Sequence, residues 1–518
     1  MDMSQCRVHP HRRATGSESE SRADPASTGP IPVTIARRAI TASDPFAAYC
    51  LLREAYGSAD CFLLESLAGH AGDRGAAVVG FGRLMKLSVS EGRISLTGDE
   101  NLVKTVTEAM LASEGVAQDE RGLSLVDREG FWRIQRALRD GFDVSGATDD
   151  GYSFGVFALY GYDAAHYVEQ LPSTIPAEDP FPDLIMTLHA GSLVFDLRRR
   201  TAAVVAAISS HWDDVDLAEV ESLVLRKPST AVRAAAEPIP RPSAIDDSAT
   251  LEGFSSAVNR ARDHIAAGDI YQVQLGHRID VTSDIDVLLV YRRLRERNPS
   301  PYMCLADFGA FHLISASPEM FVRIAGSSLT MRPIAGTAHR AGNPDVDAER
   351  VARLLDDDKE RAEHVMLVDL CRNDLGRVAV PGTVAVEALM TVERYSHVFH
   401  LVSTTVAEKL SDCDAFDVIR AAFPAGTMTG APKIRAMEII EDLETVRRGG
   451  YAGAFGLLDF GGYTNTALCI RTIFGQGNRF MLQASSGIVA DSTAGREWTE
   501  TLAKLNALFW AVTDEELL

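Results

Sequence analysis

Short apolar runs and helical patterns alternate along the first part of the chain. CFLLES, AAVVGFG, SLVFDL and TAAVVAAI are short and largely apolar, as buried strands are. AMLASEG and DLAEVESLVL instead repeat their apolar positions at helical spacing. We therefore expect a mixed α/β domain over residues 31–230.

A proline-rich stretch follows this domain. STAVRAAAEPIPRPSAIDDSAT has three prolines within five residues and small residues around them. Proline lacks a backbone donor and fixes φ, so this stretch cannot hold a helix or a central strand. We predict a linker over residues 231–249.

The pattern beyond the linker predicts a second domain over residues 250–518. LEGFSSAVNRARDHIAAGDIYQVQLGHRI predicts an amphipathic helix, a Gly-Asp turn and a strand. Hairpin signals in RRGGYAGAFGLLDFGGYTNTALCIRTIF stand among long helical segments, which disfavours a doubly wound parallel sheet. The expected fold class is α+β, a sandwich of largely antiparallel sheets with flanking helices.

Composition and charge exclude several classes of function. Of the 518 residues, 46% are hydrophobic and 24% charged, and no apolar run approaches the roughly 18 residues that span a bilayer. A formal net charge of −21 without a basic stripe argues against a nucleic-acid partner. The seven cysteines are scattered without a CxxC pair, which fits a reducing cytoplasm.

The first 30 residues are polar, rich in Ser, Pro and Arg, and lack an apolar core. This composition predicts a disordered leader over residues 1–30. A transit peptide is the alternative, but Glu18, Glu20 and Asp24 are unusual in that acidic-poor class.

Two pairs of glutamates stand beside strongly apolar segments. Glu360 and Glu363 precede VMLVDL, while Glu497, Glu500 and Lys504 share one helical face in REWTETLAKLNALFW. Solvated helix faces would explain both pairs on composition alone. If the pairs faced each other, however, the carboxylates would repel unless a cation lay between them. Hard oxygen ligands without Cys or His point to Mg²⁺, which leaves positions open for water and an anionic substrate.

Two other motifs are weaker. His397 and His400 in SHVFH could form half of a metal site, but no third nitrogen or sulfur ligand lies at a usual spacing, so packing and local polar contacts are the simpler explanation. AGTMTGAPK misses the phosphate-loop pattern, although its backbone amides could still bind an anion.

Several long motifs resemble, in order and spacing, those of the chorismate-utilising enzymes, above all the large subunit of anthranilate synthase. The motifs that carry this resemblance are RPIAGTAHR, ERAEHVMLVDLCRNDLGRVA, ERYSHVFHLVST, FPAGTMTGAPKIRAMEII, YAGAFG, CIRT and GIVADS. The dense part covers about residues 250–515. The resemblance implies the sandwich fold predicted above and chorismate as the substrate.

The resemblance also implies a role for each matching residue. Glu363 and Glu500 would bind Mg²⁺, supported by Glu360 and Glu497, and the metal would hold the ring carboxylate of chorismate. Glu319 in SASPE matches the general acid on the departing ring hydroxyl, a role that needs a protonated carboxyl. The predicted catalytic residues are His397, Glu319, Gln272 and Lys504. The predicted substrate-binding residues are Gly336, Thr337, Tyr451, Arg471, Ser485, Ser486 and Gly487.

Two positions bear on the reaction. Gln272 stands where the water-using members carry a lysine base, and an amide cannot take a proton from water, so ammonia is the expected nucleophile. Ala335 stands where aminodeoxychorismate synthases typically have a lysine that forms a covalent intermediate, which favours direct attack of ammonia at ring C2. The expected product is anthranilate, formed through 2-amino-2-deoxyisochorismate with loss of pyruvate, as in the first step of tryptophan biosynthesis. A separate glutamine amidotransferase subunit is the expected source of ammonia.

Three alternatives remain open. Ser485 and Ser486 replace the usual Gly-Ala pair before Gly487, so one alternative is a relative that stops at 2-amino-2-deoxyisochorismate for a secondary pathway. Another is aminodeoxychorismate synthase component I. A non-catalytic regulatory paralogue is disfavoured because the glutamates of the site are all present.

Two further motifs resemble the tryptophan feedback site of the family. The matching residues are Glu65, Ser66, Pro301, Tyr302 and Met303. Apart from the resemblance, FLLES would simply be a strand that ends at a turn. Phe455 and Leu457 replace a smaller aliphatic residue and a tyrosine in the wall of that site, which could alter feedback binding. We expect inhibition by L-tryptophan.

Overall fold

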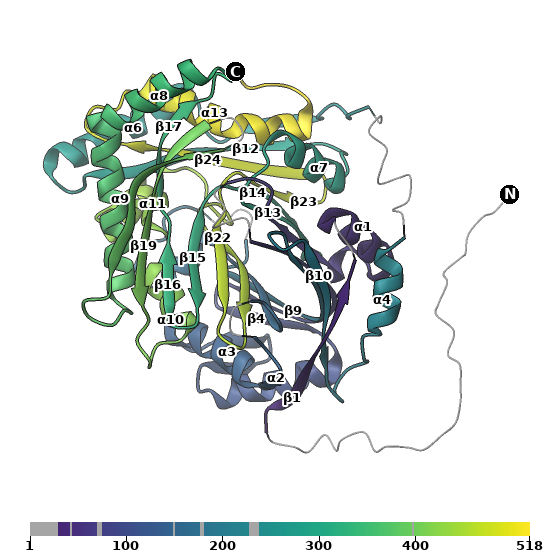
Figure 1. Cartoon of the computed structure of the whole chain (residues 1–518). Helices are drawn as coiled ribbons and strands as arrows, with labels where there is room; N and C mark the ends of the chain where they lie inside the picture. Colours follow the sequence, from purple (N-terminus) through teal and green to yellow (C-terminus); the bar gives the residue numbers. More distant parts are fainter. Residues whose placement is uncertain are drawn as a thin grey trace, which may run out of the picture.

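The computed structural model describes residues 29–41, 44–69, 75–148, 151–176, 181–226, 238–395 and 398–518 (Figure 1). His397 and all but the last two residues of the predicted leader lie outside this part of the chain. No helix in the described part is long and apolar enough to cross a membrane.

Two long strands, β3 (Ala76–Ser90) and β9 (Leu184–Asp196), pair with each other and connect two sheets. One half of β9 pairs with β10 and the other half with β8. β3 changes partner in the same way, from β2 to β4, across a register shift between Arg83 and Met85. A bulge bends a strand and raises its twist, so β3 and β9 can serve both sheets.

The first sheet continues from β8, and the turn that contains Glu319 leads into its strand β15. Its strands, in order of pairing, are β8 (Gly155–Tyr160), β21 (Ala454–Asp459), β22 (Thr464–Leu468), β15 (Met320–Ala325), β16 (Ser328–Met331) and β19 (Val398–Glu408), with β17 (Ile334–His339) and β18 (Ala385–Arg394) both on β19.

The second sheet continues from β2. Its strands, in order of pairing, are β2 (Phe62–Glu65), β13 (Tyr302–Asp307), β14 (His312–Ser317), β23 (Thr472–Gln476), β24 (Arg479–Ile488) and β12 (Gln272–Thr282), with β11 (Ala244–Asp247) and β20 (Gly430–Ala431) on the outer edge of β12.

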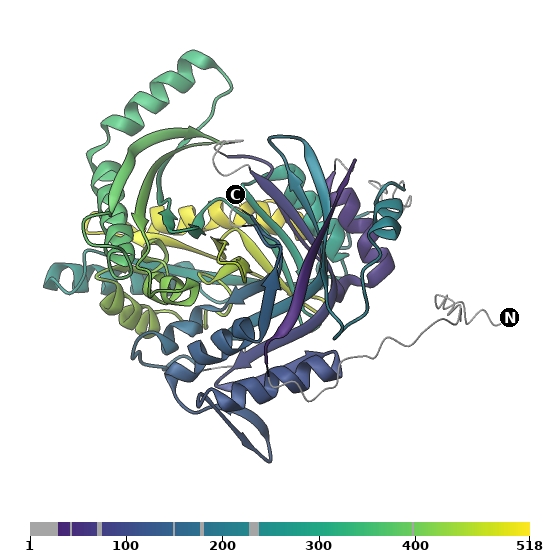
Figure 2. The same cartoon turned by 60° about the horizontal axis from the view of Figure 1, so that its bottom comes forward.

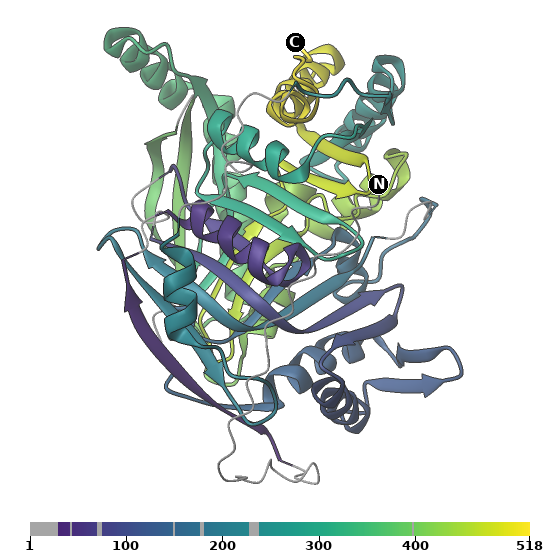
Figure 3. The ribbon, with the colours of Figure 1, turned by 90° about the vertical axis from the view of Figure 1, so that its right-hand side faces the viewer.

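The remaining strands extend the N-terminal part, where β1 forms a long arrow at the rim (Figure 3). They are β1 (Ile31–Ile40), β7 (Phe142–Ser145), β10 (Thr201–Ile208), β4 (Arg93–Gly98), β5 (Val116–Asp119) and β6 (Gly122–Leu125). In the described part of the chain, β1 and β7 are the one parallel pair. The predicted α+β class with largely antiparallel sheets is confirmed.

Helices lie on the outside of the two sheets (Figure 2). They are α1 (Pro45–Tyr56), α2 (Glu100–Ala112), α3 (Arg128–Asp140), α4 (Leu217–Val224), α6 (Leu251–Ala267), α7 (Val287–Arg297), α8 (Pro344–Asp356), α9 (Asp358–Gly376), α10 (Ala415–Ala422), α11 (Gly426–Thr429), α12 (Lys433–Leu443) and α13 (Ala494–Thr513), with short 3-10 turns at Ser58–Asp60 and Tyr162–Tyr167.

Sequence signals account for many of these elements. Helix α6 ends at Gly268, whose φ of 82° is the left-handed conformation that glycine adopts without strain. β12 begins four residues later, as the Gly-Asp turn predicts. The predicted hairpin forms from β21 and β22. The predicted linker is partly outside the described residues, and its described end carries the exposed edge strand β11.

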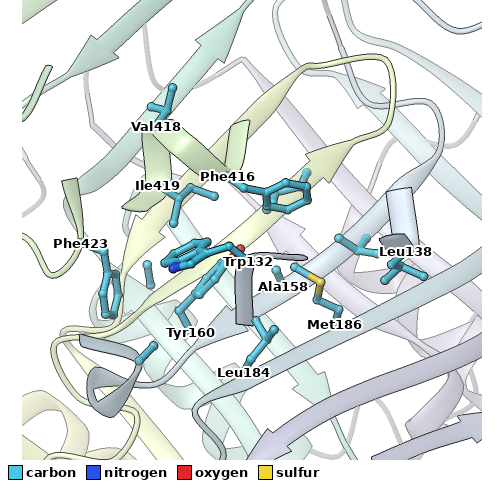
Figure 4. Close-up of a cluster of buried hydrophobic side chains, with 14 of the residues drawn as sticks. Trp132, Leu138, Ala158, Tyr160, Leu184, Met186, Phe416, Val418, Ile419 and Phe423 are labelled. Carbon is cyan, nitrogen blue, oxygen red and sulfur yellow. The ribbon is translucent and has the colours of Figure 1, made fainter. Parts of the chain in front are cut away.

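The N-terminal and C-terminal parts of the chain pack into common cores. Between the sheets, Phe62 and Phe157 stack with their ring centroids 4.7 Å apart, and Phe455 belongs to the same buried cluster. Outside the first sheet, Trp132 of α3 packs against Phe416 and Ile419 of α10 (Figure 4). Each such fully buried side chain contributes about 1.5–3 kcal/mol. Burial across this boundary fixes the sheets against each other.

Candidate active site

The predicted site residues gather where α9 and α13 meet one end of β12 and β24. The amide Nε2 of Gln272, the first residue of β12, donates to Glu363 Oε1 of α9 at 2.7 Å. Gly487 of β24 lies beside this pair, because an added Cβ there would be 2.5 Å from Gln272 Nε2 and 3.3 Å from Glu363 Oε1. Only glycine leaves room for the contact. Strand and helix motifs far apart in sequence therefore meet here.

Helix α9 presents its glutamates at its first turns. Asp357 caps the helix, because its side chain accepts hydrogen bonds from the backbone amides of Lys359 and Glu360. This acid of the charged run therefore helps to start the helix. His364 is fully buried, and its Nε2 lies 2.6 Å from Ser403 Oγ on β19. This contact ties the helix to the sheet next to Glu363.

Helix α13 is anchored by a chain of polar contacts that the sequence did not signal. His277 Nδ1 lies 2.7 Å from Asp247 Oδ1, and His277 Nε2 lies 2.9 Å from Thr501 Oγ1. Trp498 stacks on His277 with centroids 4.3 Å apart. These contacts connect Asp, His and a hydroxyl in the order of a catalytic triad. Thr501 is fully buried, however, so its hydroxyl is not accessible to a substrate. The contacts instead hold in place the helix that carries Glu500.

The carboxylates of the two helices affect each other electrostatically. Burial, and then the neighbouring Glu363, raises the pKa of Glu360. Burial also raises the pKa of Glu363, with Glu500 adding to the shift. For Glu500 burial acts in the same direction, but Lys504, whose Nζ lies 2.8 Å from Glu500 Oε1, outweighs it and lowers the pKa. The site thus gathers partly compensated negative charge, as a cation site does.

The carboxylates fit Mg²⁺ by their chemistry. All are hard oxygen donors, carried by α9 and α13. Within the described ranges, however, no three acidic, His or Cys side chains lie close enough together to hold an ion. Gln272 contacts one oxygen of Glu363, and Lys504 contacts one oxygen of Glu500. Glu497, which was predicted to support Glu363 and Glu500, is 2% exposed.

A hydrogen-bonded network around Ser485 of β24 joins several of the predicted site residues. The hydroxyls of Tyr451 and Ser485 lie 2.7 Å apart, and Ser485 Oγ donates to Gln274 Oε1 at 2.9 Å. Lys504 Nζ donates to the Ser485 carbonyl at 2.8 Å. The partly buried Arg471 guanidinium donates to the Lys504 carbonyl, and desolvation lowers the pKa of Arg471. Tyr451, Ser485, Lys504 and Arg471, all predicted site residues, are therefore connected. Gln274 also belongs to this network, although the sequence analysis did not predict it.

Ser486 differs from Ser485 although the two are adjacent. Successive side chains of a strand point to opposite faces, so Ser486 shares the face of Ala484 and Leu482, which pack in the core under α13. Its hydroxyl has no hydrogen-bond partner within the described residues. The structure thus brings the side chain of Ser485, but not that of Ser486, to the network.

The segment around Gly336, on β17, contacts His400 of the neighbouring strand β19. Gly336 has a φ of 66°, a left-handed conformation, and its carbonyl lies 3.1 Å from His400 Nδ1. Thr337 Oγ1 lies at the same distance from that nitrogen. Burial lowers the pKa of His400 to about 4, so the ring is neutral. These contacts agree with packing and local polar interactions as the role of His400, which was the simpler alternative to a metal half-site.

Glu319 stands in the turn between β14 and β15 and has the properties of a buried acid. Burial raises the pKa of its carboxyl to about 8, against smaller opposing effects of Thr427 and the Ile334 backbone. Lys504 also acts on this carboxyl, which places Glu319 within electrostatic reach of the network above. A carboxyl that stays protonated at neutral pH can donate a proton to a leaving hydroxyl. Thr427, in AGTMTGAPK, was missed because the motif matches no acid-positioning pattern.

The two motifs of the predicted tryptophan site are adjacent in space, because Glu65 of β2 pairs with Met303 of β13. The Glu65 carboxylate, however, already accepts from Tyr291 Oη at 2.6 Å and from Arg295 Nε at 2.6 Å. Phe455 is 1% exposed within the aromatic cluster between the sheets, against which Tyr302 also packs. The remaining predicted residues, Ser66 and Pro301, lie at the same strand ends, where Ser66 is buried.

Comparison with known proteins identifies the family. Residues 98–509 match the family model of the chorismate binding enzymes. The chain belongs to this family. Membership of this family supports chorismate as the substrate.

Relatives within the chorismate binding enzymes differ in their named reactions. A 2-amino-4-deoxychorismate synthase of Streptomyces globisporus is 48% identical over 95% of this chain and 99% of its own. Anthranilate synthase component 1 of Pseudomonas aeruginosa is 42% identical over 69% of this chain and 75% of its own.

Solved structures of chorismate binding enzymes show the same fold. Anthranilate synthase component I of Streptococcus pneumoniae superposes with a TM-score of 0.65 at 29% identity, covering 84% of this chain and 92% of its own. The menaquinone-specific isochorismate synthase of Escherichia coli superposes with a TM-score of 0.66 at 16% identity, covering 93% and 95%, which shows the fold alone.

Proposed function

We propose that this chain converts chorismate and ammonia to 2-amino-4-deoxychorismate and water. The observation that carries the proposal is the 48% identity to the Streptomyces globisporus synthase over nearly the full length of both chains. That product has an amine at ring C2, keeps the enolpyruvyl ether at C3 and lacks the C4 hydroxyl. It is the compound that the sequence analysis describes as 2-amino-2-deoxyisochorismate. The proposal therefore favours the predicted alternative over anthranilate formation.

Glu319 supplies the proton for the leaving group. Its carboxyl is protonated at neutral pH, because burial raises its pKa to about 8. Protonation of the C4 oxygen lets it leave as water while the C2 carbon accepts the nitrogen nucleophile. The proton that the attacking ammonia loses returns to solvent or to the Glu319 carboxylate, so the reaction releases one water per amine formed.

Glu363 and Glu500 would hold Mg²⁺, with Glu360 beside them and Glu497 in support. When bound, Mg²⁺ would neutralise the ring carboxylate of chorismate and help the ring accept electron density. Gln272 and Lys504 each contact only the Oε1 atom of these carboxylates, so the second oxygen of each is free of that contact. Arg471 and Lys504 lie beside Ser485 and suit the remaining substrate carboxylate.

Gln272 favours an amine product over a hydroxyl product. It is 1% exposed and holds Glu363 through its amide, and an amide does not remove a proton from water near neutral pH. Ammonia needs no such base. We propose that a separate glutamine amidotransferase subunit delivers it.

The Ser485 hydroxyl supports a reaction that stops before pyruvate leaves. Loss of pyruvate requires removal of the C2 proton and protonation of the enolpyruvyl group. Ser485 holds Tyr451 Oη at 2.7 Å and Gln274 Oε1 at 2.9 Å, so these groups are engaged with the protein. A small residue at position 485 would release both toward the substrate.

Anthranilate formation is the second candidate, and the 42% identity to a Pseudomonas aeruginosa anthranilate synthase component favours it. The two reactions share every step up to the aminated intermediate. Release of pyruvate separates them.

The deciding experiment incubates the purified chain with chorismate, an ammonium salt and Mg²⁺. Mass spectrometry and a coupled pyruvate assay follow the product, and NMR assigns the amine to C2 or C4, since the C4 isomer has the same mass. We expect a C2 amine that retains the enolpyruvyl group, with no pyruvate. Anthranilate with one equivalent of pyruvate would establish the second candidate, and a C4 amine would contradict both.

A further inference from the structure

A cavity of about 370 Å³ lies next to the proposed active site, on the other side of Tyr451. Its floor is a face of the second sheet, where Phe474 pairs with Met481 and Arg278 pairs with Gln483 across neighbouring strands. The turn after β3, residues 181–183 and the loop of residues 445–451 complete its walls. None of the mechanism above uses this cavity.

The amide of Gln483 is the unusual feature of the floor. The residue is 4% exposed, yet neither its Nε2 nor its Oε1 has a hydrogen-bond partner within the described part of the chain. Two positions along the same strand face, Ser485 has its hydroxyl fully engaged. A buried amide without partners loses its hydrogen bonds to water without replacement, so a ligand that satisfies it is favoured. Gln483 therefore presents an unused donor and an unused acceptor to the cavity.

Charge in the cavity favours an anionic group. Arg278 Nε lies 3.1 Å from Asp280, and its two terminal nitrogens have no hydrogen-bond acceptor among the residues that the structure describes. Of the three acids that line the cavity, Glu91 stands in the turn after β3, and the other two are engaged by neighbouring side chains. Asp163 pairs with Arg447 at 3.2 Å, and Asp183 accepts from Tyr167 Oη at 2.9 Å. A guanidinium edge with two parallel donors matches a carboxylate.

One wall of the cavity is aromatic. The ring of Phe181 lies 4.7 Å from that of Phe311 and 5.0 Å from that of Phe474, centroid to centroid. Such a cluster packs well against a planar ring. A cavity of this size holds a compound of one or two rings.

We propose that this cavity is a second small-molecule site, which binds a planar aromatic carboxylate with a hydrogen-bond donor next to the carboxylate. Arg278 binds the ligand's carboxylate. The Gln483 amide donates to that carboxylate and accepts from the neighbouring donor of the ligand, and the phenylalanine wall packs against the ligand's aromatic ring. Tyr451 lines the cavity and also holds Ser485, so a bound ligand lies against a residue of the substrate network. The inference does not depend on which amine product the enzyme makes.

Anthranilate, a fluorescent 2-aminobenzoate, is the probe for this site. The full-length chain is titrated with it, followed by fluorescence, in parallel with four variants. We expect saturable binding that weakens at least tenfold in Gln483→Leu. Met481→Trp, which fills the cavity and leaves the amide in place, should also abolish binding. Lys504→Met, on the substrate side, and Gln118→Leu, an exposed strand glutamine, should bind as the unaltered chain does.

Three outcomes overturn the proposal. Binding that is lost in Lys504→Met but kept in Gln483→Leu places the ligand in the substrate site. Absence of saturable binding, in a chain whose circular dichroism is normal, leaves the cavity to water. A Gln483→Leu chain that loses turnover with glutamine and its amidotransferase, but keeps turnover with ammonium salt and its affinity for anthranilate, assigns the cavity to the passage of ammonia.

Discussion

Gln272 donates its side-chain amide to Glu363 at 2.7 Å, which links the residue proposed to favour ammonia to a proposed metal ligand. One residue thus bears on two steps of the proposed reaction. Because Gln272 is 1% exposed and Gly487 packs against the pair, the amide has little freedom to move away without rearrangement of Glu363.

The first prediction concerns Gln272→Lys. An ammonium group at this position would pair with Glu363 and compete with Mg²⁺ for its oxygens. We expect ammonium-dependent turnover to fall at least tenfold and the Mg²⁺ concentration at half-maximal rate to rise. Steady-state rates over a Mg²⁺ series measure both. Unchanged Mg²⁺ dependence would contradict a role for Glu363 as a metal ligand.

Glu363→Gln provides the second prediction. It keeps the shape of the side chain but removes the charge that a divalent cation requires. We expect at least a hundredfold loss of turnover with an unchanged melting temperature. Asp358→Asn is the matched control on the same helix, since the Asp358 side chain is 100% exposed. Full activity of Glu363→Gln would refute the metal assignment.

Sequence reasoning predicted elements and contacts where a local pattern determines the structure. The helix at Leu251–Ala267, the strand at Gln272 and the hairpin of β21 and β22 follow from periodicity and turn residues. The meeting of Glu363, Gln272 and Gly487 followed from the family resemblance, because periodicity places a side chain on a face but does not say which face it meets.

Other features depend on tertiary contacts that no local pattern encodes. The contact of His277 with Thr501, which anchors α13, joins residues far apart in sequence. The opposite directions of Ser485 and Ser486 follow from the strand period once β24 is known, yet the family motif treated the pair as one feature. The apolar segment VMLVDL is only partly buried, since Val365 is 45% exposed.

The third prediction separates those two serines. Ser485→Gly releases Tyr451 and Gln274 from their hydroxyl partner, so we expect the product to shift toward anthranilate with pyruvate release. Ser486→Ala, on the opposite strand face, should leave the product ratio unchanged. The ratio of pyruvate to chorismate consumed measures the shift. An equal effect of both variants would show that Ser485 acts through strand stability alone.

The fourth prediction concerns L-tryptophan. The Glu65 carboxylate is engaged by Tyr291 and Arg295, and Phe455 occupies the space between the sheets. We therefore expect weak or no inhibition, in contrast to the prediction from the sequence motifs. Phe455→Val should open space at a cost of about 2–3 kcal/mol in unfolding free energy and increase the affinity for tryptophan. Rate measurements over a tryptophan series test both chains, and strong inhibition of the unaltered chain would restore the original prediction.

The last prediction follows from the buried carboxyl of Glu319, whose pKa burial raises to about 8. The general acid is protonated below that pH, so turnover should fall as pH rises through about 8. The assay must hold the concentration of free ammonia constant, because that concentration itself rises with pH. Glu319→Gln should lower turnover about 10²–10⁴-fold and remove the alkaline decline in what remains.

Stability gives an independent measurement of the same proton. The unfolded Glu319 carboxyl ionises near its ordinary value of 4.5, whereas the folded one keeps its proton to about 8, so the folded chain binds more protons between these values. Its contribution to stability is therefore fully present below the lower value and is lost as pH rises through the window. Denaturant unfolding at several pH values should show a steeper decline for the unaltered chain than for Glu319→Gln. Parallel curves would mean that the carboxyl ionises normally in the fold, and the general acid would then have to be sought elsewhere.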